Sequence, residues 1–390
     1  MLSLRGGVGS TPELNCPEED AALQAMLALP PLSAEALGKQ TLALTACRAR
    51  LIASGIDPNA YGFDAAAADY RDLLRVLHIR RANLWASAGG SVLVFDVMRQ
   101  YPQLVRSVTL EDPHPPGSRT DGRSIVLLSQ ALNRYAALCD ANKRCHAAFP
   151  DLRGQADGDY ALFQRNPVTV NIIGNPPTPI LVDGDRLAEA SEYALSNPVL
   201  LPYVASAIYT PDPNLFASAI EDWSRSPEID VPSGSYYSQL CKDYLPVSAR
   251  VSEGPAALSF PQFAGVDLIF QLDLRACAAW NVQPDDPSDF APIVSDIPTF
   301  LFGGSLNPMG SPTWFTQIAR GLTHATVLTF PTLTAFVVQS SSAPACLTGL
   351  RLDFLRHPLA HLDVSSCEIS SPPIPFVGSI VVFGPPNAQT

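Results

Sequence analysis

A tight turn of small residues between a predicted strand and a predicted helix most constrains what this chain can fold into. From Asn83 to Pro102 the segment reads Asn-Leu-Trp-Ala-Ser-Ala-Gly-Gly-Ser-Val-Leu-Val-Phe-Asp-Val-Met-Arg-Gln-Tyr-Pro. The strand ends near Trp85, and beyond the turn the apolar residues recur at helical spacing: Val92, Leu93, Phe95, Val97 and Met98. A strand followed directly by a helix favours an α/β fold, in which helices cover a mostly parallel sheet.

The register of this turn decides which residue stands at its apex. In the sharp strand-to-helix turn on which α/β-hydrolases present their nucleophile, the residues two before and two after the apex must be small. Centring the turn on position 88 puts Ala86 and Gly90 at those places, whereas centring it on Ser87 would put the indole of Trp85 there. We therefore expect Ala88, which has no hydroxyl, at the catalytic position.

The order and spacing of further motifs resemble secreted α/β-hydrolases of the tripeptidyl aminopeptidase type. Besides Asn83–Pro102, the resemblance rests on Arg5–Pro12 with Asn15-Cys16-Pro17, Cys47–Arg50, Val105–Val108, Pro115-Pro116, Cys277 with Trp280, and Pro298–Pro308. In the family the turn reads Gly-x-Ser-Tyr-Gly-Thr after Asn-Leu-Tyr, which places the serine on Ala88. The resemblance implies an α/β-hydrolase fold with a mostly parallel sheet flanked by helices, a helical lid insertion and the family's C-terminal domain.

The other two members of the catalytic triad can be located by the same resemblance. The family carries Leu-Asp-Pro after a buried strand, and here Ile297–Gly304 is followed by Leu306-Asn307-Pro308. The amide of Asn307 has no charge with which to stabilise an imidazolium. The family's histidine falls on Ala335, and no histidine lies between His324 and His357. The resemblance therefore implies a triad lost at Ala88, Asn307 and Ala335.

The resemblance also suggests how the chain is divided. We expect residues 1–116 to form the N-terminal part of the core, 117–289 a mainly helical lid, 290–340 the C-terminal part of the core and 341–390 the tail typical of the family. In the family a signal peptide, the first strands and a Gly-rich oxyanion loop precede Arg5, and we expect this sequence to lack them. The periodicity predicts helices over 19–29, 34–54, 63–77, 312–322 and 346–356 and strands over 107–110, 297–304 and 326–331.

Composition limits the classes of partner. Hydrophobic residues make up 47% of the chain and charged residues 16%, which suffices for a large core. The net charge of −12 argues against nucleic acid or an anionic membrane as partner. No apolar run is long enough for a transmembrane helix.

No cofactor or metal is expected. Cys145 and His146 are adjacent, which does not suit a zinc site, and Arg5–Gly9 lacks the context of a phosphate loop. The oligomeric state has no signature in the sequence.

The chain has eight cysteines, an even number that favours an oxidising compartment. From spacing alone their connectivity is open, and eight reduced core thiols are the alternative. The resemblance implies the pairs Cys16–Cys47, Cys139–Cys145, Cys241–Cys277 and Cys346–Cys367, and an extracellular, secreted protein.

Three functional hypotheses follow. The first is a degenerate exopeptidase without hydrolytic activity that retains a lid-covered cleft for a peptide or a small ester-like ligand. The second is an active hydrolase with an unorthodox nucleophile at Ser87 or Ser91, although Ser87 is more typical of a turn-packing residue. The third is a cyclase or lyase that uses His114 and Glu111, although Glu111 and Asp112 also suit strand-end capping. A histidine flanked by prolines, as His114 is, is expected at the surface.

Overall fold

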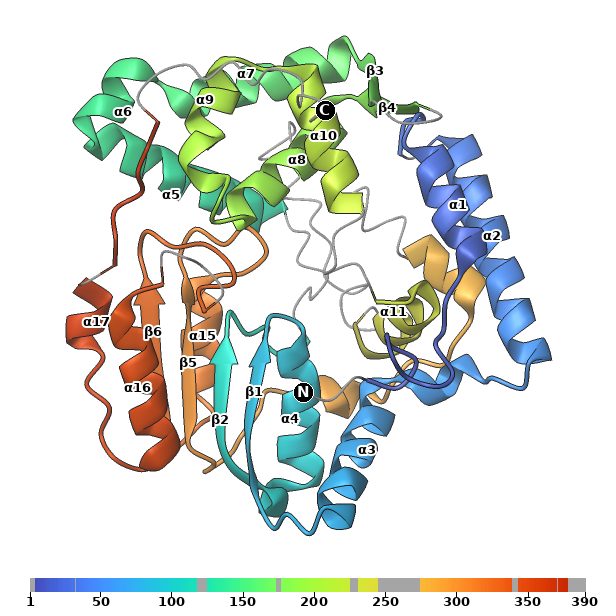
Figure 1. Ribbon diagram of the computed structural model, residues 1–390, viewed down its shortest axis with the longest axis vertical. Coiled ribbons are helices and arrows are strands. Elements are labelled where there is room, and N and C mark those ends of the chain that lie inside the picture. The colour runs from blue at the N-terminus through green and yellow to red at the C-terminus, as the bar shows by residue number, and fades with distance from the viewer. Residues whose placement is uncertain are drawn as a thin grey trace, which may run out of the picture.

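The chain forms a parallel sheet covered by helices. The computed structural model describes residues 4–31, 33–117, 125–172, 177–224, 231–244, 274–338, 343–369 and 371–377. Its main sheet has four strands in the order β1-β2-β5-β6, all parallel (Figure 1). The strands are β1 (Ala82–Ser87), β2 (Val105–Glu111), β5 (Thr299–Gly304) and β6 (Ala325–Phe330). The predicted α/β class with a mostly parallel sheet is confirmed.

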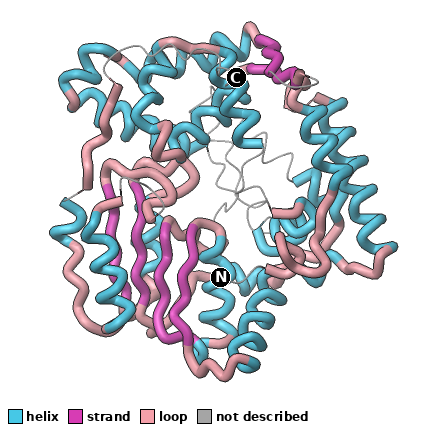
Figure 2. Tube along the Cα trace, viewed as in Figure 1, coloured by secondary structure: helices cyan, strands magenta, loops and turns pink. Residues whose placement is uncertain are grey.

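Helices cover both faces of the sheet, as Figure 2 shows by secondary structure. Along β5 the side chains alternate: Leu301 packs with the residues of α4 and α15, while Phe300 and Phe302 pack towards α16. Every residue of β5 is buried, as expected for an inner strand of a parallel sheet. The helices concerned are α3 (Phe63–Val76), α4 (Gly90–Gln100) and α15 (Pro312–Ala319) on one face and α16 (Ala345–Arg356) and α17 (Ser365–Ile369) on the other.

Strand β1 is an edge strand in the part of the chain that the structure describes. There it pairs with β2 alone. Leu84 and Ala86 face the core shared with α4, whereas Trp85 points away from that core and is 43% exposed. The strand after which the sharp turn comes is therefore the least covered of the four.

A second group of helices lies beyond the carboxyl ends of the strands, where the arrowheads point in Figure 1. Its members are α5 (Ile125–Ala141), α6 (Lys143–Ala148), α7 (Leu152–Arg165), α8 (Gly184–Ser196), α9 (Val204–Tyr209) and α10 (Pro213–Ser224), with the short turn η3 (Leu201–Tyr203). They share one apolar core. This is the segment for which a lid is predicted, and the division of the chain into four parts stays a prediction.

The helical group also contains an antiparallel hairpin that the sequence analysis did not predict. Strand β3 (Val168–Ile172) pairs with β4 (Thr178–Val182), with Val168 opposite Val182. Each strand has five residues, so its period of two is easily lost in a stretch with mainly helical spacing.

A third group packs α1 (Pro17–Met26) and α2 (Ala34–Ala53) against α11 (Ser233–Gln239) and the short π-helix η4 (Leu240–Tyr244). Its core contains Leu14, Leu44 and the fully buried Trp280. Three short 3₁₀ helices lie in the connections: η1 (Pro58–Tyr61), η2 (Pro102–Leu104) and η6 (Pro287–Phe290). The predicted ends of helices differ from the observed ones by a few residues. Helix α1 was predicted over 19–29 and spans Pro17–Met26. It begins earlier because proline suits the first helical position.

The four disulfides join the pairs that the resemblance implies: Cys16–Cys47, Cys139–Cys145, Cys241–Cys277 and Cys346–Cys367. Cys16–Cys47 ties the start of α1 to α2, and Cys346–Cys367 ties α16 to α17. Within the described residues, no helix combines the length and apolar character that a membrane crossing requires.

Candidate functional site

The residue at the apex of the strand-to-helix turn is Ala88. Its φ is +45°, a left-handed backbone that residues with a Cβ rarely adopt. The Ala88 N–H donates to the carbonyl of Glu111 on β2 (2.9 Å), and the Ala88 carbonyl accepts from the N–H of Ser91 (3.1 Å). The turn has the strained geometry of a nucleophile elbow, and its apex carries a methyl group.

The two serines beside Ala88 have different surroundings. Ser87 ends β1, is partly buried and lies opposite Glu111 in the strand register. Ser91 is fully buried, and its Oγ accepts from the N–H of His114 (3.0 Å). Its hydroxyl proton has two carbonyl acceptors in reach, on Ala88 (2.8 Å) and on His114 (3.1 Å). The Ser91 hydroxyl therefore ties the turn to the chain after β2 and does not face open space.

The positions at which the resemblance places the acid and base of the triad follow β5 and β6 at the same edge of the sheet. Asn307 and Ala335 are 2% and 3% exposed. The Asn307 Oδ1 accepts from the N–H of Met309 (2.9 Å), and the N–H of Leu306 donates to the carbonyl of Leu333 (3.0 Å), which joins the two loops. Ala88, Asn307 and Ala335 thus each follow the carboxyl end of one parallel strand.

Two buried carboxyl groups at the end of β2 lie at this edge. Asp112 has a φ of +46° and is 3% exposed, and its Oδ1 accepts from the N–H of Gly304 (3.2 Å). Glu111 is fully buried, and its Oε1 accepts from the N–H of Val338 (2.7 Å). Burial raises the pKa of both groups, and the charge of Glu111 raises that of Asp112 further. Gly303 has no room for a side chain, since a Cβ there would meet the Asp112 carboxyl group.

His114 is buried, so the expectation that it lies at the surface is wrong. It is 4% exposed, and its ring stands edge-on to Trp314 of α15, with 5.2 Å between the ring centroids. Two hydrogen bonds join Ser91 to the backbone of His114. They hold the proline-flanked loop against the start of α4 and so keep it from extending into solvent.

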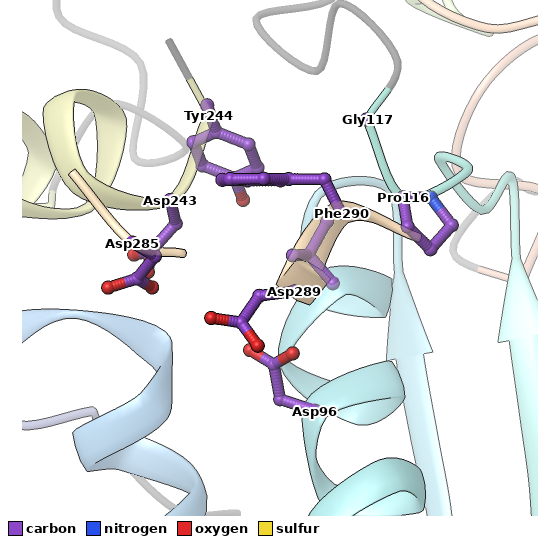
Figure 3. Close-up of a pocket in the computed structure, with 9 residues that line it drawn as sticks. Asp96, Pro116, Gly117, Asp243, Tyr244, Asp285, Asp289 and Phe290 are labelled. Carbon is purple, nitrogen blue, oxygen red and sulfur yellow. The ribbon is translucent and has the colours of Figure 1, made fainter. Parts of the chain in front are cut away.

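An acidic pocket lies beside the turn. It is lined by Val92, Asp96, Pro116, Gly117, Asp243, Tyr244, Asp285, Asp289 and Phe290, and its volume is about 10 Å³. Figure 3 shows the carboxyl groups in two pairs, Asp96 with Asp289 and Asp243 with Asp285. The Tyr244 hydroxyl donates to the carbonyl of Gly89 (3.2 Å), which connects this pocket to the turn. The space suits one group of the size of a water molecule.

The charges around this pocket are partly compensated. Burial raises the pKa of Asp96 to about 7 although the guanidinium of Arg99 lies 3.3 Å from its carboxylate. Burial also raises the pKa of Asp243, as does its carboxyl hydrogen bond with Asp285. Oxygens of Asp64, Asp243 and Asp285 lie close enough to share a metal ion, but the Lys242 ammonium pairs with Asp285 and lies 3.5 Å from Asp64. Lys242 thus already supplies a cation to that cluster.

None of these acids was among the predicted site residues. Asp96 and Asp243 are far apart in the chain, and no spacing signal relates them, because the fold alone brings α4, η4 and η6 together.

A third feature lies at Ala335. A pocket of about 40 Å³ is bounded by Ala335, by η3 and by the proline-rich segment 371–375. Thr332 and Ser371 share a hydroxyl hydrogen bond of 2.6 Å, which holds this segment against the loop after β6. The lining is mainly apolar and contains prolines, leucines and Ile374. The lining residues include no histidine, carboxylate or lysine side chain.

The sequence matches no protein-family model and no curated protein. Among solved structures the chain is similar to an α/β-hydrolase enzyme from a Medee basin deep-sea metagenome library (14% identity, 78% of this chain and 74% of that chain, TM-score 0.32). It is also similar to a thermophilic esterase from Thermogutta terrifontis, with 14% identity, coverage of 78% of this chain and 76% of that chain, and a TM-score of 0.32. A variant of an epoxide hydrolase from Bacillus megaterium has 11% identity to this chain, with coverage of 77% of this chain and 78% of that chain and a TM-score of 0.33.

These scores are too low to carry an argument about family or activity. The class of fold is defined by the chain itself: a parallel sheet with helices on both faces, and a left-handed strand-to-helix turn at the carboxyl end of β1. That combination is the α/β-hydrolase type of fold.

Proposed function

We propose that this chain is a tripeptidyl aminopeptidase-like α/β-hydrolase that does not hydrolyse its ligand by the serine mechanism. We further propose that it is secreted and that it binds the amino end of a peptide. The observation that carries the first part is the left-handed Ala88 at the apex of the turn. The backbone there keeps the shape that presents a nucleophile, while the side chain offers none.

The expected loss of activity is large. Removing the nucleophile of a serine protease lowers kcat by about 10⁶-fold, and further triad losses add little because the members act as a unit. In this chain the acid and base positions hold Asn307 and Ala335. An amide and a methyl group provide neither an imidazole nor a charge to orient one.

The acidic pocket supports a ligand with an ammonium group. Asp96, Asp289, Asp243 and Asp285 face a space of about 10 Å³, which suits a terminal ammonium. An ammonium beside Asp96 would favour the charged form of that carboxyl group and so lower its pKa. Because the Tyr244 hydroxyl joins the pocket to the turn at Gly89, a peptide held by its amino end there would run towards the sheet edge.

Hydrolysis of an aminoacyl-nitroanilide tests the first part of the proposal. We expect the protein and its Ser87→Ala variant to give the same rate as buffer, measured by release of nitroaniline. An Ala88→Ser variant is expected to stay inactive, because no base activates the new hydroxyl. Turnover by the unaltered protein that disappears in Ser87→Ala would instead establish the hypothesis of an unorthodox serine.

Binding of a dipeptide and of its N-acetylated form tests the ligand. By calorimetry at pH 7.5 we expect the free dipeptide to bind and the acetylated one to bind about tenfold more weakly or not at all. Asp96→Asn should weaken binding of the free dipeptide, while Asp353→Asn, an exposed acid on α16, serves as the matched control. Equal affinity for both peptides would contradict the ammonium site.

The cyclase or lyase hypothesis finds less support. Glu111 and His114 line neither the acidic pocket nor the pocket at Ala335, and both are buried. A general acid or base must reach the proton that it moves, directly or through one water.

A further inference from the structure

The largest of the three described pockets lies inside the helical group, away from the sheet edge. Its volume is about 80 Å³, and helices α7, α8, α9 and α10 surround it. The walls are mostly apolar and include Leu187, Ala190, Val204, Ile208, Leu215 and Phe216. Tyr203, 37% exposed, stands among the lining residues. The space exceeds what a single water molecule needs and is smaller than cavities of about 150 Å³ that hold benzene in otherwise closed cores.

One carboxyl group interrupts the apolar wall. Asp159 on α7 lines the cavity and is 6% exposed. Its Oδ1 accepts from the Gln155 amide (3.1 Å), whereas its Oδ2 is buried with no hydrogen-bond partner in the described residues. The neighbouring cation Arg153 on the same helix is ion-paired with Asp157 (3.0 Å). A buried carboxyl oxygen without a donor destabilises the fold unless a ligand or water supplies one.

We propose that this cavity is a second binding site, for a small apolar primary amine. The ammonium would donate to Oδ2 of Asp159, and the hydrocarbon part would contact the side chains of α8, α9 and α10. Burial raises the pKa of Asp159 to about 6, so the carboxylate that such a ligand needs is present above that pH. The site is independent of the acidic pocket, because the two share no lining residue.

Propylamine, which is smaller than benzene, is the probe, with 1-propanol as its neutral counterpart, and binding is measured by calorimetry at pH 7.5. We expect propylamine to bind about tenfold more tightly than 1-propanol, the difference that a charge-assisted hydrogen bond provides. Asp159→Asn should bring the two affinities together. Asp353→Asn, which removes an exposed acid on α16, is the control and should leave the ratio unchanged.

A second variant separates loss of the site from loss of the fold. Ala190→Leu adds side-chain atoms at the cavity wall and should abolish binding of both probes while the far-ultraviolet circular dichroism stays that of the unaltered protein. Equal affinity for amine and alcohol, or amine binding that survives Asp159→Asn, would overturn the inference. So would amine binding lost in Asp96→Asn and kept in Asp159→Asn, since the amine would then occupy the acidic pocket; dipeptide binding tests that pocket separately.

Discussion

At the scale of single residues, Ala88 adopts the left-handed backbone conformation of a nucleophile elbow, although its methyl side chain cannot act as a nucleophile. A left-handed conformation costs a residue with a Cβ about 1–2 kcal/mol. The hydrogen bonds of Ala88 with Glu111 and Ser91 hold that conformation in place. The strain therefore belongs to the junction of β1 and α4, and it persists although the position carries no reactive group.

Substitutions at Ala88 should show this strain in the free energy of unfolding. Ala88→Val, which puts a β-branched side chain at positive φ, should destabilise by about 1–3 kcal/mol. Ala88→Gly should cause no such loss, because glycine adopts this region freely. The measurement is urea unfolding, and Ala49→Val on the exposed side of α2 is the control, expected to cost about 0.5 kcal/mol. Equal losses at both positions would show that the turn is not strained.

The residues around the turn were predictable to different degrees. Trp85 excludes the other register from sequence alone, because its indole is too large for the turn. The burial of Asp112 and His114 was not predictable. Asp112 is enclosed because Gly303 leaves space beside it, and His114 because Ser91 and Trp314 hold it, and these partners are distant in sequence.

At the scale of elements, α1 is joined to α2 and α11 by a buried polar network. The Tyr237 hydroxyl donates to Glu19 (3.0 Å), and the amide of Gln40 donates to the Tyr237 oxygen (3.2 Å). Glu19 is 1% exposed, and burial raises its pKa from 4.5 to about 7. The folded chain thus keeps a proton on Glu19 at pH values at which the unfolded chain has lost it.

This proton makes stability depend on pH in a defined direction. The contribution of Glu19 is fully present below about pH 4.5 and is lost as the pH rises through about 7, on the order of 3 kcal/mol in all. We expect the free energy of unfolding in urea to fall from pH 5 to pH 8, and to fall less in Glu19→Gln. Glu18→Gln is the control: Arg50 lowers the pKa of Glu18, so its titration lies below this range. An unchanged slope in Glu19→Gln would contradict this assignment.

Regular elements were predicted best where packing repeats over many residues. Strand β5 contains the apolar run Phe300–Phe302, β2 and β6 are rich in β-branched residues, and α2 is 20 residues long. The hairpin of β3 and β4 was missed because two five-residue strands carry little periodic signal and depend on the surrounding core for their stability.

At the scale of the whole molecule, the described chain consists of a covered parallel sheet, a helical group at its carboxyl edge and the group of α1, α2 and α11 (Figure 1). The resemblance to tripeptidyl aminopeptidase-type hydrolases was enough to predict the four cysteine pairs and the class of fold. Neither cavity with unusual acids could be predicted. Asp96 meets Asp289 across a tertiary contact, and Asp159 is exceptional only because the helices around it are apolar.

The central claim is that this α/β-hydrolase fold carries no serine nucleophile. Incubation of the purified protein with a fluorophosphonate, followed by intact-mass measurement, tests it most directly, because that reagent reports an activated hydroxyl on any serine. We predict that the mass of the protein is unchanged after incubation, as it should also be for Ser87→Ala and Ser91→Ala. Addition of one phosphonyl group to the unaltered protein, absent in either serine variant, would contradict the claim.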